Sequence, residues 1–597
     1  MQIANNAKIL LSAGVVVVLV LIAVFVYVQF QPEIATETTS EKYEEVLSKP
    51  GEKIGAVVSS HELATNAGYQ MLEIGGTAAD AAVAVAAVLS VVEPWFSSVL
   101  GGGTWALYYS VHDDEVTSLD AVGPTGSNVT VADYRGRAGN AGIHQANTPG
   151  AWDGWMVWLY EYGRLDLGQV LAPAIAIARD GYTISDEMGS WLARDEAVIR
   201  RHPDTAAIYV RDGSIAQAGQ TIQQHNMADT LEALVDAYSE KIEEGRGEAI
   251  AAARDYFYRG PIAEQIVAFS DANGGYLTIE DFDNVDAQIV TPISIDYKDG
   301  IRVFQNPPNS QGITMLLALN VLKQFDLREL GEGSDAIHVQ AEAVKLAFAD
   351  RHYHIGDPSR VSVPIDALLE DSYASSHRER VDMNSAMRWP LPDYLSEQIA
   401  LDEDLANTTT FHVVDSHGNG AAVTTSLGAQ FLVAGETGIH MNNRMRFLAL
   451  EDGDPNQVTP GYKVRHTSNP YMAFKNNSLY ILGGNTGADT QSQAQVQQFV
   501  NIVEFDMTAA EAIAAPRFIS TAFPATTYPH SYTNLLRVES SMPSSLVTAL
   551  RQKGHEVQVG GTGYGTANVI ILSEDGEDAD VAAEPRINVA SGRTIKF

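Results

Sequence analysis

Residues 407–426 read NTTTFHVVDSHGNGAAVTTS, and this stretch decides the fold. Its three consecutive threonines follow an acidic, proline-bearing segment at residues 390–407 and precede FHVVD (411–415), a run of β-favouring residues. A second such run, AAVTTS, covers residues 421–426. The pattern predicts an exposed segment that enters a strand at a run of threonines.

Thr408 is a candidate nucleophile within this run. A threonine hydroxyl needs a base to remove its proton, and a threonine at a chain N-terminus can use its own α-amino group. That would require cleavage of the Asn407–Thr408 bond, for which an accessible segment joined to a strand is a suitable place. The residues alone leave a second interpretation open, because threonine-rich starts of ordinary strands are common.

The glycines of GGNTGA (483–488) also allow two interpretations. Their backbone N–H groups could stabilise an oxyanion, or they could form an ordinary turn between a strand and a helix.

The rest of the chain from Gly51 onward mixes short β-rich runs with helical stretches. Beyond the two runs above, β-rich runs cover residues 55–60, 104–110, 478–484 and 568–572. Residues 78–92 are apolar on nearly every side, which predicts a helix buried on several sides. The spacing of apolar residues predicts further helices over residues 171–180, 335–350 and 493–505.

The composition limits the classes of function. Hydrophobic residues make up 45% and charged residues 19% of the 597 residues, which is typical of a globular protein with a large core. Acidic residues (75) outnumber basic ones (38), so the net charge is −37 and no nucleic-acid partner is expected. Without cysteine there are no disulfides, zinc–thiolate sites or thiol nucleophiles. Phosphate-binding loops, H-E-x-x-H zinc helices and G-x-S-x-G nucleophile elbows do not occur.

An uncharged run of twenty residues, ILLSAGVVVVLVLIAVFVYV (9–28), is long enough to cross a membrane as a helix. Lysine precedes it and glutamates follow it, so the charge rule predicts a cytoplasmic tail (1–8), a transmembrane anchor (9–30) and a polar tether (31–50). The rest of the chain would then lie on the periplasmic or extracellular side. A cleaved signal peptide, which is usually shorter and ends in a small-x-small site, and a buried core helix are the alternatives.

Six longer motifs, in order, resemble the γ-glutamyltranspeptidase family, and nearly the whole chain after the anchor takes part. They are the block at 55–109 that ends SSVLGGGTWALYY, NTPGAWDGW (147–155), NPPNSQGIT (306–314), AEAVKLAFADRHYHIGDPSRV (341–361), EAIAAPRF (511–518) and AAEPRINVASG (582–592).

The resemblance implies an α+β fold, the four-layer αββα sandwich of the N-terminal-nucleophile hydrolases. It also implies self-cleavage before Thr408 into a large subunit (51–407) and a small subunit (408–597) that form a heterodimer. The mature Thr408 would attack a small-molecule amide, glutathione-like or another acyl amide, and pass the acyl group to water or an amine. No cofactor or metal is implied, since the nucleophile carries its own base.

Further site residues follow from the resemblance. Ser426 matches a second hydroxyl residue that hydrogen-bonds the nucleophile, and Gly487 and Ala488 match a glycine pair whose N–H groups form the oxyanion hole. Alanine keeps that N–H but restricts the backbone angles.

The positions that would bind the substrate depart from the family pattern. The arginine that holds the glutamyl α-carboxylate is replaced by Val122, and the aspartate that binds the α-amino group is replaced by Phe447. Loss of such charged contacts weakens substrate binding by about 2–5 kcal/mol each. An ordinary γ-glutamyl compound is therefore not expected as the substrate unless Arg444 or Arg446 binds its carboxylate instead. The remaining candidates for substrate binding are Asn443, Arg444, Arg446, His466 and Thr467. His466 and Thr467 stand where the family has two serines, and Gly428 stands where it has an asparagine.

Four functions therefore stay open. The first is a γ-glutamyl hydrolase or transpeptidase with a rebuilt substrate clamp. The second is an amidohydrolase or acylase for a non-glutamyl substrate. The third is a membrane-anchored homologue with little or no catalysis, and the last is a different fold altogether.

Overall fold

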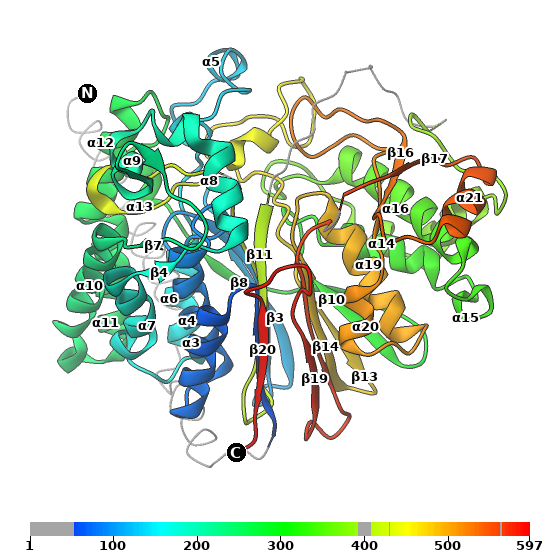
Figure 1. Ribbon diagram of the computed structural model, residues 1–597, viewed down its shortest axis with the longest axis horizontal. Helices are drawn as coiled ribbons and strands as arrows, with labels where there is room; N and C mark the ends of the chain where they lie inside the picture. Colours follow the sequence, from blue (N-terminus) through cyan, green and yellow to red (C-terminus); the bar gives the residue numbers. More distant parts are fainter. Residues whose placement is uncertain (1–52, 392–406, 429, 562–563) are drawn as a thin grey trace, which may run out of the picture. The chain divides into compact units, whose positions relative to one another are not determined.

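The computed structural model of the chain describes residues 53–391, 407–428, 430–561 and 564–597 (Figure 1). The predicted tail, anchor and tether (1–50) lie outside these residues, as does most of the exposed segment predicted at 390–407. Among the helices of the described ranges, none combines the length and the apolarity needed to cross a membrane.

The larger of two central sheets has seven strands, and every neighbouring pair is antiparallel. Their spatial order is β20 (Ser591–Ile595), β1 (Gly55–Ser59), β11 (Asn407–Val414), β12 (Gly420–Gly428), β2 (Gly103–Ser110), β3 (Glu115–Ala121) and β8 (Gln288–Val290). The threonine run thus begins β11, which is paired on both sides. Residues 408–414 are all buried, which fits their β-branched and apolar side chains.

The second sheet has six antiparallel strands and faces the first. Its order is β19 (Ala579–Ala582), β18 (Ala567–Leu572), β14 (Ser478–Asn485), β13 (Tyr471–Lys475), β10 (Ile301–Gln305) and β9 (Ile293–Asp296). Apolar side chains from both sheets, among them Val58 and Leu107 on one side and Leu482 and Ile570 on the other, form a common core.

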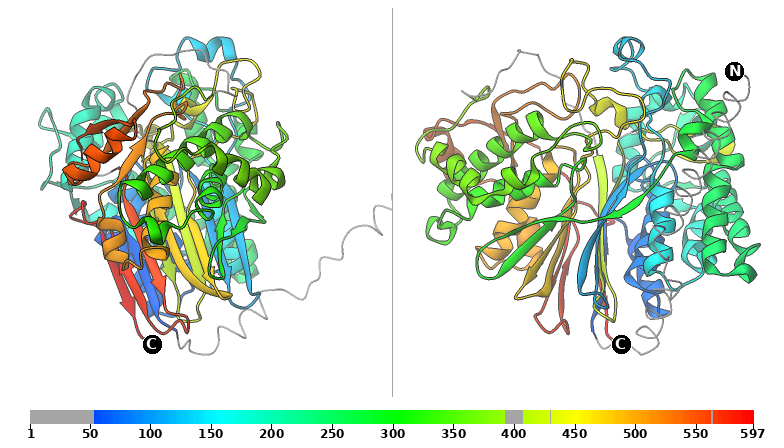
Figure 2. Two further views of the ribbon diagram at one scale, coloured as in Figure 1. Left: turned by 90° about the vertical axis from the view of Figure 1, so that its right-hand side faces the viewer. Right: turned by 180° about the vertical axis from the view of Figure 1, so that it is seen from behind.

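Helices cover the outer face of each sheet, so the order of layers is α, β, β, α (Figures 1 and 2). The helices on the side of the larger sheet are α3 (Glu62–Glu73), α4 (Ala78–Val92), α6 (Ala151–Tyr162), α7 (Leu167–Asp180), α10 (His225–Ser239), α11 (Arg246–Tyr258) and α12 (Pro261–Ala272). Those on the side of the second sheet are α14 (Ile313–Leu322), α16 (Ser334–His354), α19 (Thr490–Val503) and α20 (Ala509–Ala514).

Smaller elements surround these layers. A three-stranded sheet consists of β15 (Phe518–Ser520), β16 (Leu535–Val538) and β17 (Glu556–Val559), and two short strand pairs are β4 (Tyr182–Thr183) with β7 (Thr221–Ile222) and β5 (Val210–Arg211) with β6 (Ser214–Ile215). The remaining helices are α5 (Val131–Arg135), α8 (Asp186–Ile199), α9 (Pro203–Tyr209), α13 (Ile279–Asp283), α15 (Leu327–Leu330), α17 (Ile365–Leu369), α18 (Asp371–Arg380) and α21 (Ser544–Gln552).

The predicted α+β class is confirmed, and each predicted helix and strand is present. Helix α4 has the predicted bounds because a capping box of Thr77 and Asp80 starts it, and all its residues are buried. Helix α7 begins at Leu167, four residues before the predicted start at residue 171. Asp166 and Gln169 form a capping box at this observed start. Both sheets contain strands from before and strands from after Thr408.

Candidate active site

Thr408 lies at an irregularity in the pairing of β11 with β12. Asn407 pairs with Gly428 and Thr409 with Thr425, so one residue on β11 faces two on β12. Its Oγ1 is 3.0 Å from the Ser426 Oγ, the hydroxyl that the resemblance places beside it. In the uncut chain Thr408 is only 1% exposed.

Gln491 on α19 is a second partner of the candidate nucleophile. Its Nε2 donates a hydrogen bond of 3.2 Å to the Thr408 Oγ1. The sequence analysis missed this residue, which stands in a glutamine-rich helix (TQSQAQVQQ, 490–498). The number of glutamines in this short stretch could have indicated a polar contact, because buried glutamines need hydrogen-bond partners.

A buried carboxyl group next to Thr409 was also missed. The Ser60 Oγ and the Thr409 Oγ1 donate hydrogen bonds of 2.7 and 2.9 Å to the Glu93 Oε2. Burial raises the pKa of Glu93 to about 7, although the hydrogen bonds from the two hydroxyl groups lower it. On α8, burial and then the charge of Glu93 raise the pKa of Glu187 to about 8. The strand of the nucleophile is therefore tied to an acidic group that titrates near neutral pH.

Gly487 and Ala488 form the turn between β14 and α19 that the sequence placed at a candidate oxyanion hole. Both have positive φ angles, +98° and +45°, and for alanine this left-handed conformation is strained by about 1–2 kcal/mol. Within the described part of the chain, neither backbone N–H group donates a hydrogen bond to protein. Both are thus available to an oxyanion.

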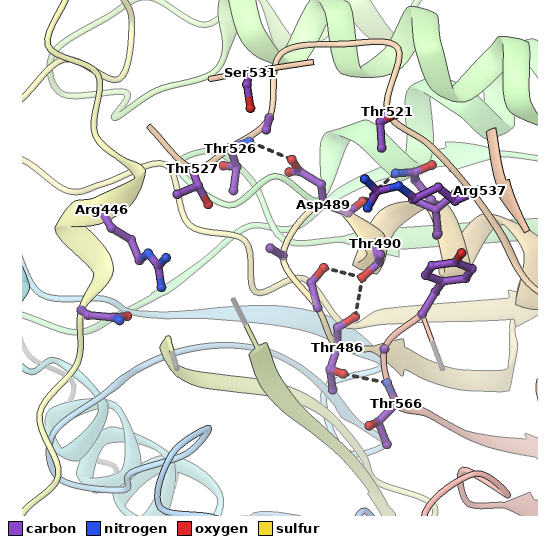
Figure 3. Close-up of a pocket in the computed structure, with 18 of the residues that line it drawn as sticks. Arg446, Thr486, Asp489, Thr490, Thr521, Thr526, Thr527, Ser531, Arg537 and Thr566 are labelled. Atoms are coloured by element: carbon purple, nitrogen blue, oxygen red, sulfur yellow. Dashed lines mark hydrogen bonds between the residues drawn. The ribbon is translucent and has the colours of Figure 1, made fainter. Parts of the chain in front are cut away.

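A cavity of about 1100 Å³ lies beside this turn. Gly487, Ala488 and Asn443 line it, and Figure 3 shows Arg446 across the cavity from Asp489 and Thr490. Asp489 is held by an ion pair with Arg351 and accepts a hydrogen bond of 2.7 Å from the Thr526 N–H. The wall around the turn is therefore rigidly supported.

Arg444 and Thr467 are brought together in the interior. The Arg444 Nη1 donates to the Thr467 Oγ1 at 3.3 Å, and burial lowers the pKa of this guanidinium to about 9. Arg446 instead lines the cavity, and burial lowers its pKa to about 10. The neighbouring His466 is buried too, and burial and the charge of Arg444 hold its pKa well below the usual 6.5.

The structure explains why position 428 is a glycine rather than the asparagine of the family pattern. Its φ is +111°, and a Cβ placed there would lie 1.6 Å from the Asn443 Oδ1. An asparagine here would displace the side chain of Asn443.

A possible metal-ligand group exists among the described residues, away from the candidate nucleophile's partners. His338, Glu342 and His555 bring one ligand atom each within 4.8 Å of one another. The His338 Nδ1 is hydrogen-bonded to the His555 Nε2 at 2.8 Å, and the Lys345 Nζ donates to the Glu342 Oε1 at 2.6 Å. The group is thus already paired within the protein.

Comparisons with known proteins show the family to which the chain belongs. The gamma-glutamyltranspeptidase family model matches residues 64–592. A glutathione hydrolase-like proenzyme of Bacillus subtilis (strain 168) is 33% identical over 530 residues, which are 87% of this chain and 95% of the relative. The glutathione hydrolase proenzyme of Escherichia coli (strain K12) is 33% identical over 557 residues, 89% of this chain and 91% of the relative. The cephalosporin acylase from Bacillus halodurans, a solved structure, has a TM-score of 0.80 at 29% identity and covers 92% of this chain and 96% of its own. The chain therefore belongs to the γ-glutamyltranspeptidase family and is an enzyme of its hydrolase and transferase kind.

Proposed function

We propose that this enzyme is a self-processing N-terminal-threonine amidohydrolase that cleaves small-molecule amides through an acyl-enzyme. The observation that carries the proposal is the contact of Thr408 with Ser426 and Gln491 at the start of β11. A threonine hydroxyl with two polar partners is oriented for attack, and cleavage before it would supply the missing base.

The first reaction would be self-cleavage. The Thr408 Oγ1 attacks the carbonyl carbon of Asn407, the C–N bond breaks, and the proton of the hydroxyl passes to the departing nitrogen. Water then hydrolyses the resulting ester. The products are a carboxylate on Asn407 and a free hydroxyl and α-amino group on Thr408.

The second reaction would use the mature Thr408 on a substrate amide. Its α-amino group takes the proton as the hydroxyl attacks the amide carbon, and the backbone N–H groups of Gly487 and Ala488 stabilise the oxyanion. The proton then passes to the leaving amine as the C–N bond breaks. Water or a second amine releases the acyl group from the ester.

Thr408→Ala tests the proposal. We expect wild-type protein to give two fragments on a denaturing gel, with a new N-terminus at Thr408 by mass spectrometry, and the variant to stay whole. Thr410→Ala is a matched control, because its hydroxyl donates to the Val423 carbonyl oxygen within the sheet at 2.9 Å and should not affect cleavage. Wild-type protein that stays uncut after long incubation would contradict the proposal.

Two substrate classes remain for this site, γ-glutamyl amides and other acyl amides. Val122 and Phe447, where the resemblance implies a charged clamp, both belong to one buried apolar cluster together with Ala488. This observation favours a non-glutamyl acyl group, in agreement with the likeness to a cephalosporin acylase.

We also propose that residues 9–30 anchor the enzyme in a membrane, with the catalytic part on the periplasmic or extracellular side. The support is the length and the charge asymmetry of the uncharged run.

A further inference from the structure

Three buried side chains bring ligand atoms together where α16 meets the turn between α21 and β17. His338 and Glu342 are four residues apart on α16 and therefore share one face of that helix. His555 belongs to the turn after α21, a helix that packs against α16 (Figure 1). One ligand atom from each residue lies within 4.8 Å of the other two, and all three residues are buried. Two imidazoles and a carboxylate are the protein ligands of a common type of zinc site.

The separations between these atoms are close to those in a metal site. The His338 Nδ1 lies 2.8 Å from the His555 Nε2, which in turn lies 4.0 Å from the Glu342 Oε1. In a tetrahedral site with zinc bonds of about 2.0–2.2 Å, two ligand atoms are about 3.4 Å apart. The two measured distances fall on either side of this value, so small side-chain rotations would bring the three atoms into place.

Hydrogen bonds to the surrounding chain orient two of the three ligands. The His338 Nε2 donates to the Asp382 carbonyl oxygen at 2.9 Å, which leaves the lone pair of the neutral ring on Nδ1. The Met387 N–H donates to the Glu342 Oε2 at 2.8 Å, and Oε1 is the oxygen within 4.0 Å of His555. Contacts of this kind, made by the second polar atom of a ligand, fix the orientation of ligands in metal sites.

A proton and an ammonium group compete with a metal ion for these atoms. The His555 Nε2 donates the proton that it shares with the His338 Nδ1, so metal binding requires this proton to move to the His555 Nδ1. The Lys345 Nζ donates to the Glu342 Oε1 at 2.6 Å and to the Met387 carbonyl oxygen at 2.8 Å. It would release the carboxylate oxygen and keep the carbonyl group. The ion pair with Lys345 is therefore the main competitor of a metal ion.

A single segment of the chain covers the site. Asp382 and Met387, which contact the ligands, both belong to residues 382–388. Several residues of this segment are exposed, namely Asp382, Asn384, Ser385 and Arg388. Displacement of this one segment would therefore be enough to admit an ion.

We propose that His338, Glu342 and His555 bind one Zn²⁺ ion, with water as its fourth ligand. The protein ligands come from both sides of the Asn407–Thr408 bond, so the ion would link the two parts of the enzyme and stabilise the fold. None of the three is among the described partners of Thr408. The inference is therefore independent of the proposed hydrolase function.

Titration of the purified enzyme with Zn²⁺, after treatment with EDTA, tests the inference. We expect one Zn²⁺ per chain with a dissociation constant below about 1 µM. The melting temperature should rise by about 2 °C at a free Zn²⁺ concentration 100 times that constant. Co²⁺, which accepts the same nitrogen and oxygen ligands, should show the intense visible absorption of a four-coordinate ion. Wild-type protein that binds neither ion would overturn the inference.

His555→Gln should weaken zinc binding at least 100-fold, because it removes a ligand. The glutamine Nε2 can still donate to the His338 Nδ1, which protects the fold. Glu342→Gln is a second variant with the same expected loss. His225→Ala is the matched control, since His225 is exposed at the start of α10 and its loss should leave zinc binding unchanged. Equal zinc binding by wild type and His555→Gln would place the ion elsewhere and contradict the inference.

Lys345→Met should tighten zinc binding about tenfold, because it removes the group that competes for the Glu342 Oε1. Zinc should also raise the melting temperature of this variant more than that of the wild type. Unchanged or weaker binding by Lys345→Met would show that Glu342 is not a ligand. Zinc binding by Lys345→Met but not by wild type would show that the natural group is an ion pair and no metal site, which would also overturn the inference.

Discussion

At the residue scale, the nucleophile depends on polar groups that come from distant parts of the chain. Ser426 and Gln491 contact the hydroxyl of Thr408 directly, whereas Glu93 holds the next residue, Thr409, through its hydroxyl. Glu93 is a positioning residue in this arrangement, because its carboxyl group reaches the nucleophile only through Thr409.

Glu93→Gln should flatten the pH dependence of stability. Burial raises the pKa of Glu93 to about 7 from an ordinary 4.5, so the folded protein binds a proton that the unfolded chain has released between these values. The stabilising contribution is complete below about pH 4.5 and is lost as pH rises through 7. Melting temperatures from pH 5 to 8 should thus fall more in wild type than in the variant, whose amide oxygen still accepts the two hydroxyl hydrogen bonds.

Glu115→Gln is the control for that experiment, because Glu115 is exposed on β3. Its pH profile should match that of the wild type. Parallel profiles for Glu93→Gln and wild type would show that Glu93 is charged throughout this range.

At the element scale, the sheets are built from both sides of the Asn407–Thr408 bond. The bond joins the first two residues of strand β11, which lies between β1, from before the bond, and β12, from after it. In the second sheet β10 pairs with β13 across the same division. Cleavage would therefore leave the hydrogen bonds between the two parts in place.

We expect the two fragments of cleaved protein to stay together under native conditions. Size-exclusion chromatography should give a single peak that contains both, because separating them would expose paired backbone groups and the core between the sheets. The fragments should separate only in denaturant, for example in concentrated urea. Elution of a free 408–597 fragment from native protein would contradict this expectation.

At the scale of the whole molecule, every described element begins at or after Gly55, and the uncharged run 9–28 is separate in sequence from this part. The contacts of residues 50–597 form one compact unit. The catalytic part thus does not draw on the proposed anchor for its strands or helices.

Removal of residues 1–50 should move the enzyme from the membrane fraction to the aqueous fraction without changing its melting temperature. Val17→Lys with Ile22→Lys in the full chain should act similarly, since each central lysine costs about 2.5–3.5 kcal/mol on insertion. The measurement is fractionation followed by mass spectrometry of the N-terminus. A full-length preparation that is aqueous and begins after residue 30 would instead indicate a cleaved signal peptide.

The sequence by itself determined the main helices and strands and predicted the candidate nucleophile. Helix α4 and strands such as β14 and β18 follow from local periodicity and composition, which act over neighbouring residues. The resemblance to the γ-glutamyltranspeptidase family implied that Ser426 contacts Thr408, and the structure places the two residues on paired strands. The charge pattern of residues 1–50 is likewise visible in the sequence alone.

Only the tertiary structure decided which side chains meet. Glu93 reaches Thr409 across 316 residues of sequence, and Gln491 reaches Thr408 across 83. Two nitrogens of Arg444, Nε and Nη2, have no hydrogen-bond partner among the described residues, which only the structure shows. The physical reason is that burial and pairing depend on long-range packing, which brings together residues with no local signal of their contact.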